Sequence, residues 1–139
     1  MVLEECINFL LTSAQHTVFQ EMTSRLSVYN LTPVQYAVLY CLWDEDNRNP
    51  KEIAERLRLE NSTVSGILER MEKKDLIQRN ISPTDRRHIQ VCLLDKGAML
   101  KNDVIRTVEE VNVDVMARYT KEETETLKNL LRRLDEPPK

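Results

Sequence analysis

Glycine and aromatic residues are scarce in this chain of 139 residues. It holds two glycines, and Phe, Trp and Tyr together make up 5% of it. β-Sandwiches and barrels use glycine in their turns and aromatic residues in their strands, so this scarcity favours a mainly helical protein. Hydrophobic residues make up 41% of the chain, enough for one ordinary core, and the length is that of a single domain.

Long hydrophobic runs are absent as well. No apolar stretch approaches the roughly 18 residues of a transmembrane helix, so we expect no membrane partner. The N-terminal segment MVLEECINFLLTSAQ carries acidic residues where a secretory signal peptide carries basic ones. We therefore expect a cytoplasmic protein.

Cysteine and histidine are few and widely spaced. The three cysteines, Cys6, Cys41 and Cys92, form no CxxC pair, which argues against a disulfide scaffold or a zinc ribbon. The two histidines, His16 and His88, cannot supply the three or four clustered ligands that zinc needs, so we expect no metal and no cofactor. No Cys/His pair has the context of a catalytic nucleophile, so we expect that the protein is not an enzyme.

The net charge of −3 taken alone argues against a nucleic-acid partner. The charges are unevenly distributed, however. Residues 48–90 contain ten basic and seven acidic residues, a net charge of +3, whereas the rest of the chain carries −6. A negatively charged partner such as DNA would be drawn to the middle of the chain and repelled from its ends.

Apolar residues recur at helical spacing at both ends of the chain. One amphipathic helix is predicted over residues 3–27 and another over 96–119, where an apolar stripe runs from Leu100 to Tyr119. Thr120 and Glu123 form the capping-box pattern of a last helix. That helix carries Leu127, Leu130, Leu131 and Leu134. The terminal helices have more apolar surface than a monomer would hide, which predicts a dimer.

The middle of the chain holds three helix patterns and two strand patterns. Helix starts are predicted at Thr32-Pro33 and at Asn49-Pro50, where a capping residue precedes proline. A further helix follows from residue 61, with apolar residues on one face and short polar residues on the other. Strands are predicted at 77–81 and 88–94, joined by the turn sequence Ser82-Pro83-Thr84-Asp85. This order describes a helix-turn-helix followed by a β-wing, a unit that places one helix in a DNA major groove.

Three stretches of the sequence carry a resemblance to a known family. They are LTPVQYAVLYCLW (31–43), KEIAERLRLENSTVSGILERMEKKDLIQR (51–79) and PTDRRHIQVCLLDKG (83–97). Together they resemble the MarR family of winged-helix transcription regulators. The most specific part is the wing signature of Asp85, Arg87 and Lys96-Gly97.

The resemblance implies a mainly α fold with a small β-wing, a winged helix-turn-helix in which long N- and C-terminal helices form a dimerisation region. It implies one domain over residues 1–139, with a DNA-binding lobe at 31–95 and dimerisation helices at 1–30 and 96–139. It also implies a homodimer that binds double-stranded DNA at a pseudo-palindromic operator.

The candidate DNA contacts lie on the helix that starts near residue 61 and on the wing. Hydroxyl and amide groups can contact bases or phosphates, while arginine fixes position. The candidates are Asn61, Ser62, Thr63, Ser65, Arg70, Arg79, Asp85, Arg86 and Arg87. By the motif, Arg87 enters the minor groove, where negative potential is concentrated, and Asp85 holds the loop. An ordinary solvated helix and hairpin would carry similar residues, and the wing directly after the helix favours DNA.

A candidate effector pocket comes from the same resemblance. In the family, small phenolic or aromatic effectors bind between the dimer helices and the DNA-binding lobe. The residues of this chain expected there are His16, Tyr36, Tyr40 and Trp43. The alternative for each is plain core packing.

The chain departs from the family pattern at three places. Asp75 stands where the family often has glycine after the recognition helix, at a cost of about 1 kcal/mol in a left-handed cap. Leu93-Leu94 replaces the usual Leu-Thr after the wing, so we expect Asp95 to cap the following helix. Gly66 stands where a basic residue often follows a serine, which removes one base or phosphate contact.

Cys6 offers another mode of control. One branch of the family senses peroxide through a lone cysteine near this point. An ungapped reading anchored on residues 33–36 puts the sensor position at Asn8, and two residues turn a helix by about 200°. We therefore expect Cys6 to be a packed small hydrophobe and not the primary switch.

These observations predict a sequence-specific DNA-binding transcriptional regulator, a dimeric repressor released by a small-molecule effector. Two alternatives stay open. One is a winged-helix protein-interaction module, which Gly66 and the acidic totals favour. The other is a redox-sensing regulator that uses Cys6.

Overall fold

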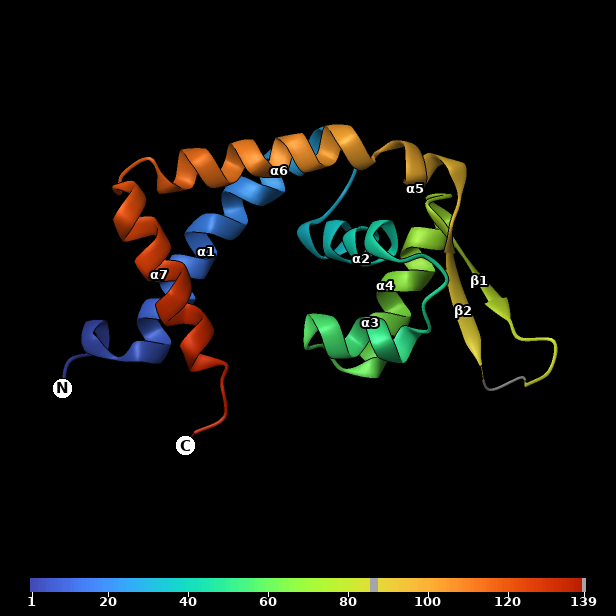
Figure 1. Cartoon of the computed structure of the whole chain (residues 1–139), viewed down its shortest axis with the longest axis horizontal. Helices are drawn as coiled ribbons and strands as arrows, with labels where there is room; N and C mark the ends of the chain where they lie inside the picture. The colour runs from blue at the N-terminus through green and yellow to red at the C-terminus, as the bar shows by residue number, and fades with distance from the viewer. Residues whose placement is uncertain (86–87, 139) are drawn as a thin grey trace.

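The computed structural model describes residues 1–85 and 88–138. Its helices and strands are α1 (Ile7–Leu26), α2 (Pro33–Asp44), α3 (Pro50–Leu57), α4 (Asn61–Lys73), β1 (Ile77–Ile81), β2 (Ile89–Leu93), α5 (Asp95–Met99), α6 (Lys101–Met116) and α7 (Lys121–Leu134). Two short 3₁₀ turns, Leu3–Glu5 and Ser27–Tyr29, flank α1. The predicted mainly helical fold with a small antiparallel wing is confirmed (Figure 1).

The helix starts follow the local capping chemistry of the sequence. The Thr32 hydroxyl accepts from the Gln35 N–H, and the Gln35 side chain accepts from the Thr32 N–H, at 3.2 Å each. Thr120 and Glu123 form the same reciprocal pair at the start of α7. These bonds satisfy N–H groups that have no partner inside the helix, so the predicted starts of α2 and α7 are confirmed.

The long terminal helices are divided where we expected continuous ones. The predicted helix over 3–27 is broken at Cys6, which has extended backbone (φ −69°, ψ 126°). The predicted helix over 96–119 is two helices that meet at Leu100. Its expected cap is also wrong, because Leu94 occupies the N-cap position without a side-chain bond and Asp95 is the first helical residue. The division at Leu100 follows from tertiary contacts, since α5 is held at the base of the wing while α6 packs along α1.

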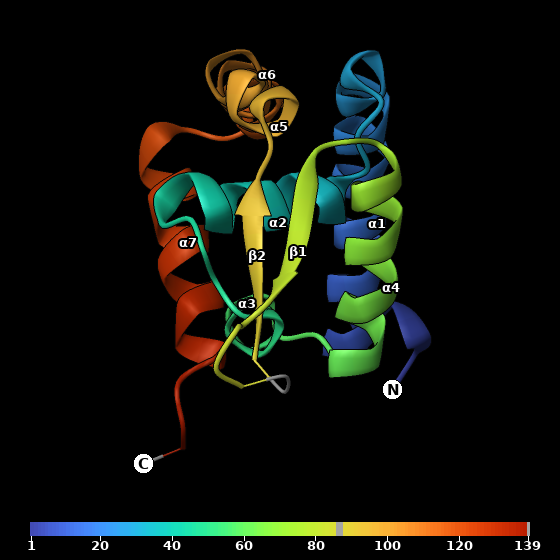
Figure 2. The same ribbon diagram turned by 90° about the vertical axis from the view of Figure 1, so that its right-hand side faces the viewer.

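The core lies between the three central helices and the wing. Val38, Leu39, Ile53 and Leu68 are fully or almost fully buried there, each at most 1% exposed. Val104 of α6 belongs to the same hydrophobic cluster. The core therefore joins the central helices to the long helix above them (Figure 2).

The wing is paired on both sides of β2. The register of β1 and β2 pairs Ile77 with Leu93 and Ile81 with Ile89. Across the other edge of β2, the Val91 N–H donates to the Arg48 carbonyl at 2.7 Å and the Arg48 N–H donates back at 3.2 Å. This bridge joins the loop between α2 and α3 to the wing through backbone hydrogen bonds.

Within residues 1–85 and 88–138, four non-glycine residues have left-handed backbone. They are Asn30 (φ 56°), Asn47 (φ 61°), Arg58 (φ 57°) and Asp75 (φ 60°). Asn30 and Arg58 follow helical segments directly, and Asp75 lies just beyond the end of α4. The left-handed conformation expected at Asp75 is therefore present.

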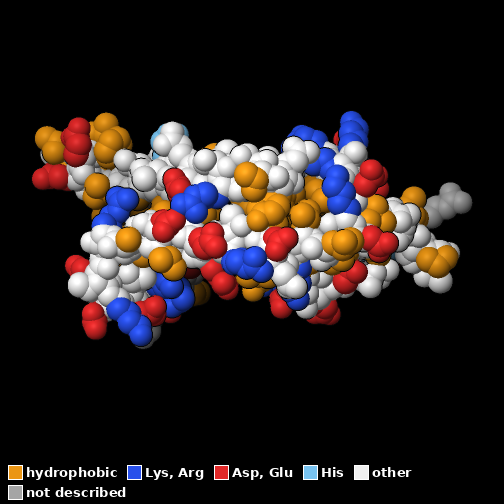
Figure 3. Space-filling model, turned by 90° about the horizontal axis from the view of Figure 1, so that it is seen from above, with side chains coloured by type: hydrophobic (Ala, Val, Ile, Leu, Met, Phe, Trp, Pro, Cys, Tyr) orange, Lys and Arg blue, Asp and Glu red, His pale blue; other side chains and the backbone are white. Residues whose placement is uncertain are grey.

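The terminal helices form an elongated part beside this core. The Arg25 guanidinium of α1 pairs with the Asp114 carboxylate of α6, and the Tyr29 hydroxyl lies 2.7 Å from that of Thr107. In contrast, α7 contains no buried residue. Figure 3 shows apolar side chains gathered at the end of the molecule where Figure 1 places the N-terminus. Among the described residues, no helix is both long and apolar enough to cross a membrane.

Candidate nucleic-acid interface

The outer face of α4 is lined by short polar side chains. Its inner face is anchored by Val64, Ile67, Leu68 and Met71, all buried. This anchoring leaves the opposite side of the helix in solvent. The exposed residues of its first turns include Asn61, Ser62, Thr63 and Ser65. Figure 2 shows the N-terminal end of α4 at the same end of the molecule as the wing tip.

A groove lies between the starts of α3 and α4 and the wing. It has a volume of about 320 Å³ and is lined by Asn49, Pro50, Lys51, Asn61, His88 and Ile89. The sequence reasoning did not single out Lys51 or His88 as parts of this surface. Lys51 and His88 are far apart in the sequence. They come together because β2 pairs with the loop between α2 and α3, which brings the wing beside the start of α3.

The helix-turn-helix turn and the wing turn are both fixed by backbone bonds. At the first, the Leu59 N–H donates to the Ala54 carbonyl at 3.0 Å. At the second, the His88 N–H donates to the Asp85 carbonyl at 3.0 Å, and the two side chains lie 3.5 Å apart. The predicted contacts Arg86 and Arg87 lie outside the described residues.

Arg79, a predicted DNA contact, is engaged by Glu72 of α4. Its Nε and Nη2 atoms lie 2.8 and 2.7 Å from Glu72 Oε1, and its backbone N–H donates to Oε2 at 3.0 Å. The backbone hydrogen bond from Arg79, followed by the guanidinium contacts, holds the pKa of Glu72 below its ordinary value. Both side chains are about 30% exposed, so this pair ties β1 to α4 at the edge of the surface.

Arg70, another predicted contact, is exposed on the outer side of α4. Its guanidinium nitrogens lie 3.7 and 3.8 Å from the position that a Cβ on Gly66 would take. The structure describes no carboxylate paired with it. Arg70 therefore differs from Arg79 in having its charge open to a partner.

Three of the four residues predicted for an effector pocket come together on α2. The Tyr36 ring contacts those of Tyr40 and Trp43, with centroids 6.2 and 6.4 Å apart. Burial, followed by the proximity of Tyr40, raises the pKa of Tyr36. Trp43 Nε1 donates to the Gly97 carbonyl at 2.9 Å. His16 is exposed on α1 and does not line this region.

A cavity of about 220 Å³ opens beside these rings. It is lined by Tyr40, Trp43, Asp44, Lys101 and Ile105, so it lies between α2 and α6. The Arg56 guanidinium stands over the Tyr40 ring at 5.7 Å and donates to Asp44 at 2.9 Å. The Asp44 charge is thus partly compensated. Lys101 has no carboxylate partner in the described part of the chain.

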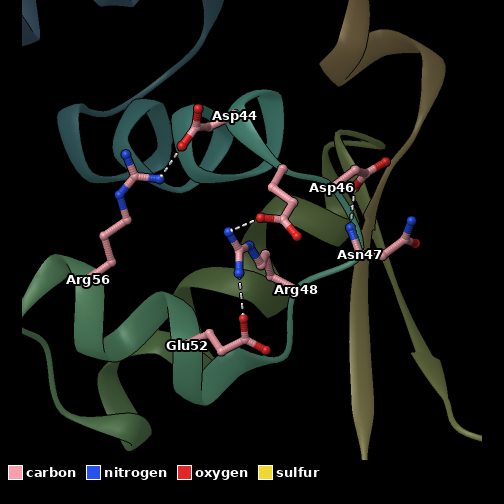
Figure 4. A network of polar contacts seen from close by, with 7 residues as sticks. Asp44, Asp46, Asn47, Arg48, Glu52 and Arg56 are labelled. Atoms are coloured by element: carbon pink, nitrogen blue, oxygen red, sulfur yellow. Dashed lines mark hydrogen bonds and ion pairs between the residues drawn. The ribbon is translucent and has the colours of Figure 1, made fainter.

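A polar network fastens the loop between α2 and α3, and the sequence reasoning treated this segment only as a connection. Arg48 lies 2.5 Å from Glu45 and 2.7 Å from Glu52, in the network drawn in Figure 4. Asp46 accepts from the Leu93 N–H at 3.0 Å. The loop therefore holds β2 and the start of α3 together. Three consecutive acidic residues followed closely by Arg48 are the sequence signal for it.

The cysteines occupy three different environments. Cys6 is half-buried at the N-cap of α1 and its side chain makes no capping bond. Cys41 is buried, and that burial raises the pKa of its thiol. Cys92 is half-buried on β2, where its thiol donates to Asn47 Oδ1 at 2.8 Å. The described residues contain no group of three or more potential metal ligands.

Known proteins similar to this chain are transcriptional regulators. A model described as the MarR family matches residues 31–89. The HTH-type transcriptional regulator MgrA of Staphylococcus aureus is 36% identical over 110 residues, which cover 78% of this chain and 75% of MgrA. The organic hydroperoxide resistance transcriptional regulator of Bacillus subtilis is 32% identical over 105 residues, which cover 76% of this chain and 71% of that regulator.

The fold is also that of a solved DNA complex. The transcriptional repressor CouR, bound to a 23-mer DNA duplex, superposes with a TM-score of 0.87 at 27% identity, covering 96% of this chain and 95% of CouR. The winged-helix description obtained from the sequence is thereby confirmed.

The Glu72–Arg79 pair predicts a pH-dependent stability. Folding lowers the pKa of Glu72 below its ordinary value of 4.5. The ionised carboxylate therefore stabilises the native state when the pH is above 4.5. This contribution is lost as the pH falls through the lower pKa of the folded state. Glu72→Gln should lower the free energy of unfolding at neutral pH by an amount on the order of 1 kcal/mol. The difference from the wild type should shrink below pH 4.5. Denaturant unfolding of the wild type and of Glu72→Gln at a series of pH values measures this difference.

The matched control for that measurement is Glu69→Gln on the same helix. Glu69 lies 3.6 Å from Lys73 in an exposed pair, which contributes little. A Glu72→Gln deficit that is independent of pH would contradict the role assigned to the carboxylate charge.

Proposed function

The chain belongs to the MarR family of transcriptional regulators, and from that premise we propose that it is a dimeric repressor that binds a pseudo-palindromic operator and is released by a small aromatic effector. The observation that carries the proposal is the outer face of α4. Short polar side chains there stand beside the wing, on a helix whose opposite face is anchored in the core. This is the arrangement in which a recognition helix enters a major groove.

We assign the two parts of the fold to two tasks. Residues 31–95 form the DNA-binding lobe, and residues 1–30 and 96–139 form the dimerisation region. Two lobes held by one dimer can meet half-sites spaced by a helical turn of about 34 Å. Such a protein acts where chromosomal DNA is, which for this family is the cytoplasm.

Exposed apolar side chains on the terminal helices support the dimer. Leucines on α7 and apolar residues at the start of the chain are open to solvent in one protomer. They are Leu3, Ile7, Leu10, Leu11, Leu127, Leu130, Leu131 and Leu134. Monomeric proteins seldom expose so many large apolar residues at one end, whereas a second copy would bury them.

The cavity beside Tyr40 and Trp43 suits a small aromatic carboxylate. The two rings offer faces for stacking, and the Lys101 ammonium offers a charge for the carboxylate. A ligand there would press on Trp43, whose indole N–H holds the Gly97 carbonyl at the base of the wing. Effector binding and DNA binding would then be linked through the angle between the lobes.

A redox switch at Cys6 is the second candidate, because one relative is an organic hydroperoxide resistance regulator. The position of Cys6 argues against it. The cysteine lies two residues before the position expected for the sensor, and its close neighbours Glu4 and Glu5 are acidic, which disfavours a reactive thiolate. A protein-interaction module is the third candidate and would bind no DNA.

The first prediction from this proposal concerns the oligomer. The protein should have the mass of a dimer in size-exclusion chromatography with light scattering at micromolar concentration. Leu130→Glu should shift it toward the monomer, because it places a charge in the apolar face of α7. Ile81→Glu on the wing, where Ile81 is also exposed, is the control and should leave the dimer intact. A monomeric wild type would remove the half-site argument.

The second prediction concerns DNA. Selection from randomised duplexes of about 30 base pairs should enrich a pseudo-palindrome, since two recognition helices read it. Arg87→Ala should weaken binding to the selected duplex and lower the salt slope by about one per subunit. Lys128→Ala on α7 is the control, because it removes the same single positive charge at a site outside the wing. Failure to enrich any sequence would favour the protein-interaction module.

The third prediction separates the two modes of release. Benzoate or its hydroxylated derivatives should weaken operator binding by the wild type about tenfold, and Lys101→Ala should lose this response. Mild hydroperoxide should affect wild type and Cys6→Ser equally. Release of the wild type alone by hydroperoxide would establish the redox switch in place of the aromatic effector.

A further inference from the structure

The chain has two glycines, and the fold explains one of them. A Cβ on Gly97 would lie 2.3 Å from the Leu76 carbonyl oxygen and 3.3 Å from a Leu93 methyl carbon. No side chain fits there without moving backbone. Gly97 is thus required by packing between α5 and the base of the wing.

Gly66 has no comparable reason within the fold. No glycine has a positive φ, so the helical backbone at Gly66 suits any residue. A Cβ there would meet only the Arg70 guanidinium, at 3.7 and 3.8 Å, which is ordinary van der Waals contact. Glycine in a helix interior is nevertheless costly, because it loses more backbone freedom on folding than alanine. A cost that the described residues do not explain points to a partner outside the chain.

The position of Gly66 identifies the side from which that partner comes. It lies one turn after Ser62 on α4, on the face opposite the buried Ile67, Leu68 and Met71. The neighbouring outward residues are exposed, whereas Gly66 is half-buried because the flexible Arg70 guanidinium lies over it. Once that guanidinium turns toward a partner, the missing side chain lets the partner approach the helix backbone more closely at Gly66 than at Ser62.

Arg70 supplies the chemistry at that place. Long side chains on a helix point back toward its N-terminus, which lays the guanidinium over the residue one turn earlier. The carboxylates nearest to it on α4 are already engaged, Glu69 by Lys73 and Glu72 by Arg79. The guanidinium of the exposed Arg70 therefore lies over Gly66 without a carboxylate partner in the described residues, and its planar set of donors is available to a partner.

We propose that Gly66 marks the closest approach of α4 to the base edges of the major groove, and that Arg70, turning outward from its place over Gly66, donates two hydrogen bonds to a guanine. A guanine presents O6 and N7 as paired acceptors there, which match the fork of an arginine. The basic residue that the family often has at the position of Gly66 is thus replaced by one reaching back from the next turn. This inference rests on the proposed DNA-binding function and specifies how the site is read.

Gly66→Ala tests the approach, because the two roles of this glycine predict effects of opposite sign. In the full-length protein, alanine should raise the midpoint of thermal unfolding, since it favours the helix and clashes with nothing. The same substitution should weaken binding to the duplex selected by the wild type about tenfold, because the added methyl group holds the helix away from the bases. Gly97→Ala is the matched control and should lower the midpoint.

Arg70→Lys and Arg70→Ala test the contact. Lysine keeps the charge but loses the planar fork, so the salt slope should stay unchanged while one position per half-site loses its preference for guanine. Alanine should lose that preference and also bind more weakly. If Arg70→Ala lowers the salt slope and every base preference is retained, the arginine holds a phosphate and the assignment to guanine is overturned.

The outcomes also separate this inference from the function on which it rests. A wild type that selects no sequence contradicts the DNA-binding proposal itself. A wild type that selects an operator which Gly66→Ala binds equally well overturns only the close approach at Gly66.

Discussion

The close contact between α5 and the end of α4 is the constraint on which the rest of the structure depends. The Leu76 carbonyl accepts from the Leu94 N–H at 3.0 Å and lies against Gly97, where a Cβ would not fit. The Lys96 ammonium donates to the Lys74 carbonyl at 2.9 Å. The segment after α4, the base of the wing and α5 are thus held together by backbone contacts at one corner of the fold.

The polar network between α2 and β2 does a related task at the other edge of the wing. Arg48 pairs with Val91 through its backbone and with Glu45 and Glu52 through its side chain. These ion pairs are partly exposed, so each contributes modestly to stability. Their value is geometric, because they keep the wing and the start of α3 at a fixed separation on the surface that we assign to DNA.

Features set by short-range chemistry could be predicted from the sequence. The capping boxes at Thr32 and Thr120 define helix starts within four residues, so pattern alone located them. The break at Leu100 could not be predicted, because it depends on α5 being held at the base of the wing while α6 packs along α1. The charge of Arg79 predicts a DNA contact, and only the fold brings Glu72 against it. In the same way, the aromatic cluster on α2 follows from helical spacing. That His16 lies away from this cluster depends on how α1 packs in the fold.

The four left-handed residues carry a consequence for the unfolded chain. A glycine at Asn30, Asn47, Arg58 or Asp75 would relieve strain of roughly 1 kcal/mol in the native state. It would also give the denatured ensemble more freedom, at a cost of about 0.4–1 kcal/mol. The two effects nearly cancel, so the backbone conformation of these turns is almost neutral toward glycine. What distinguishes residues there is their side-chain bonds, such as that from Cys92 to Asn47, whereas at residue 97 the packing itself admits only glycine.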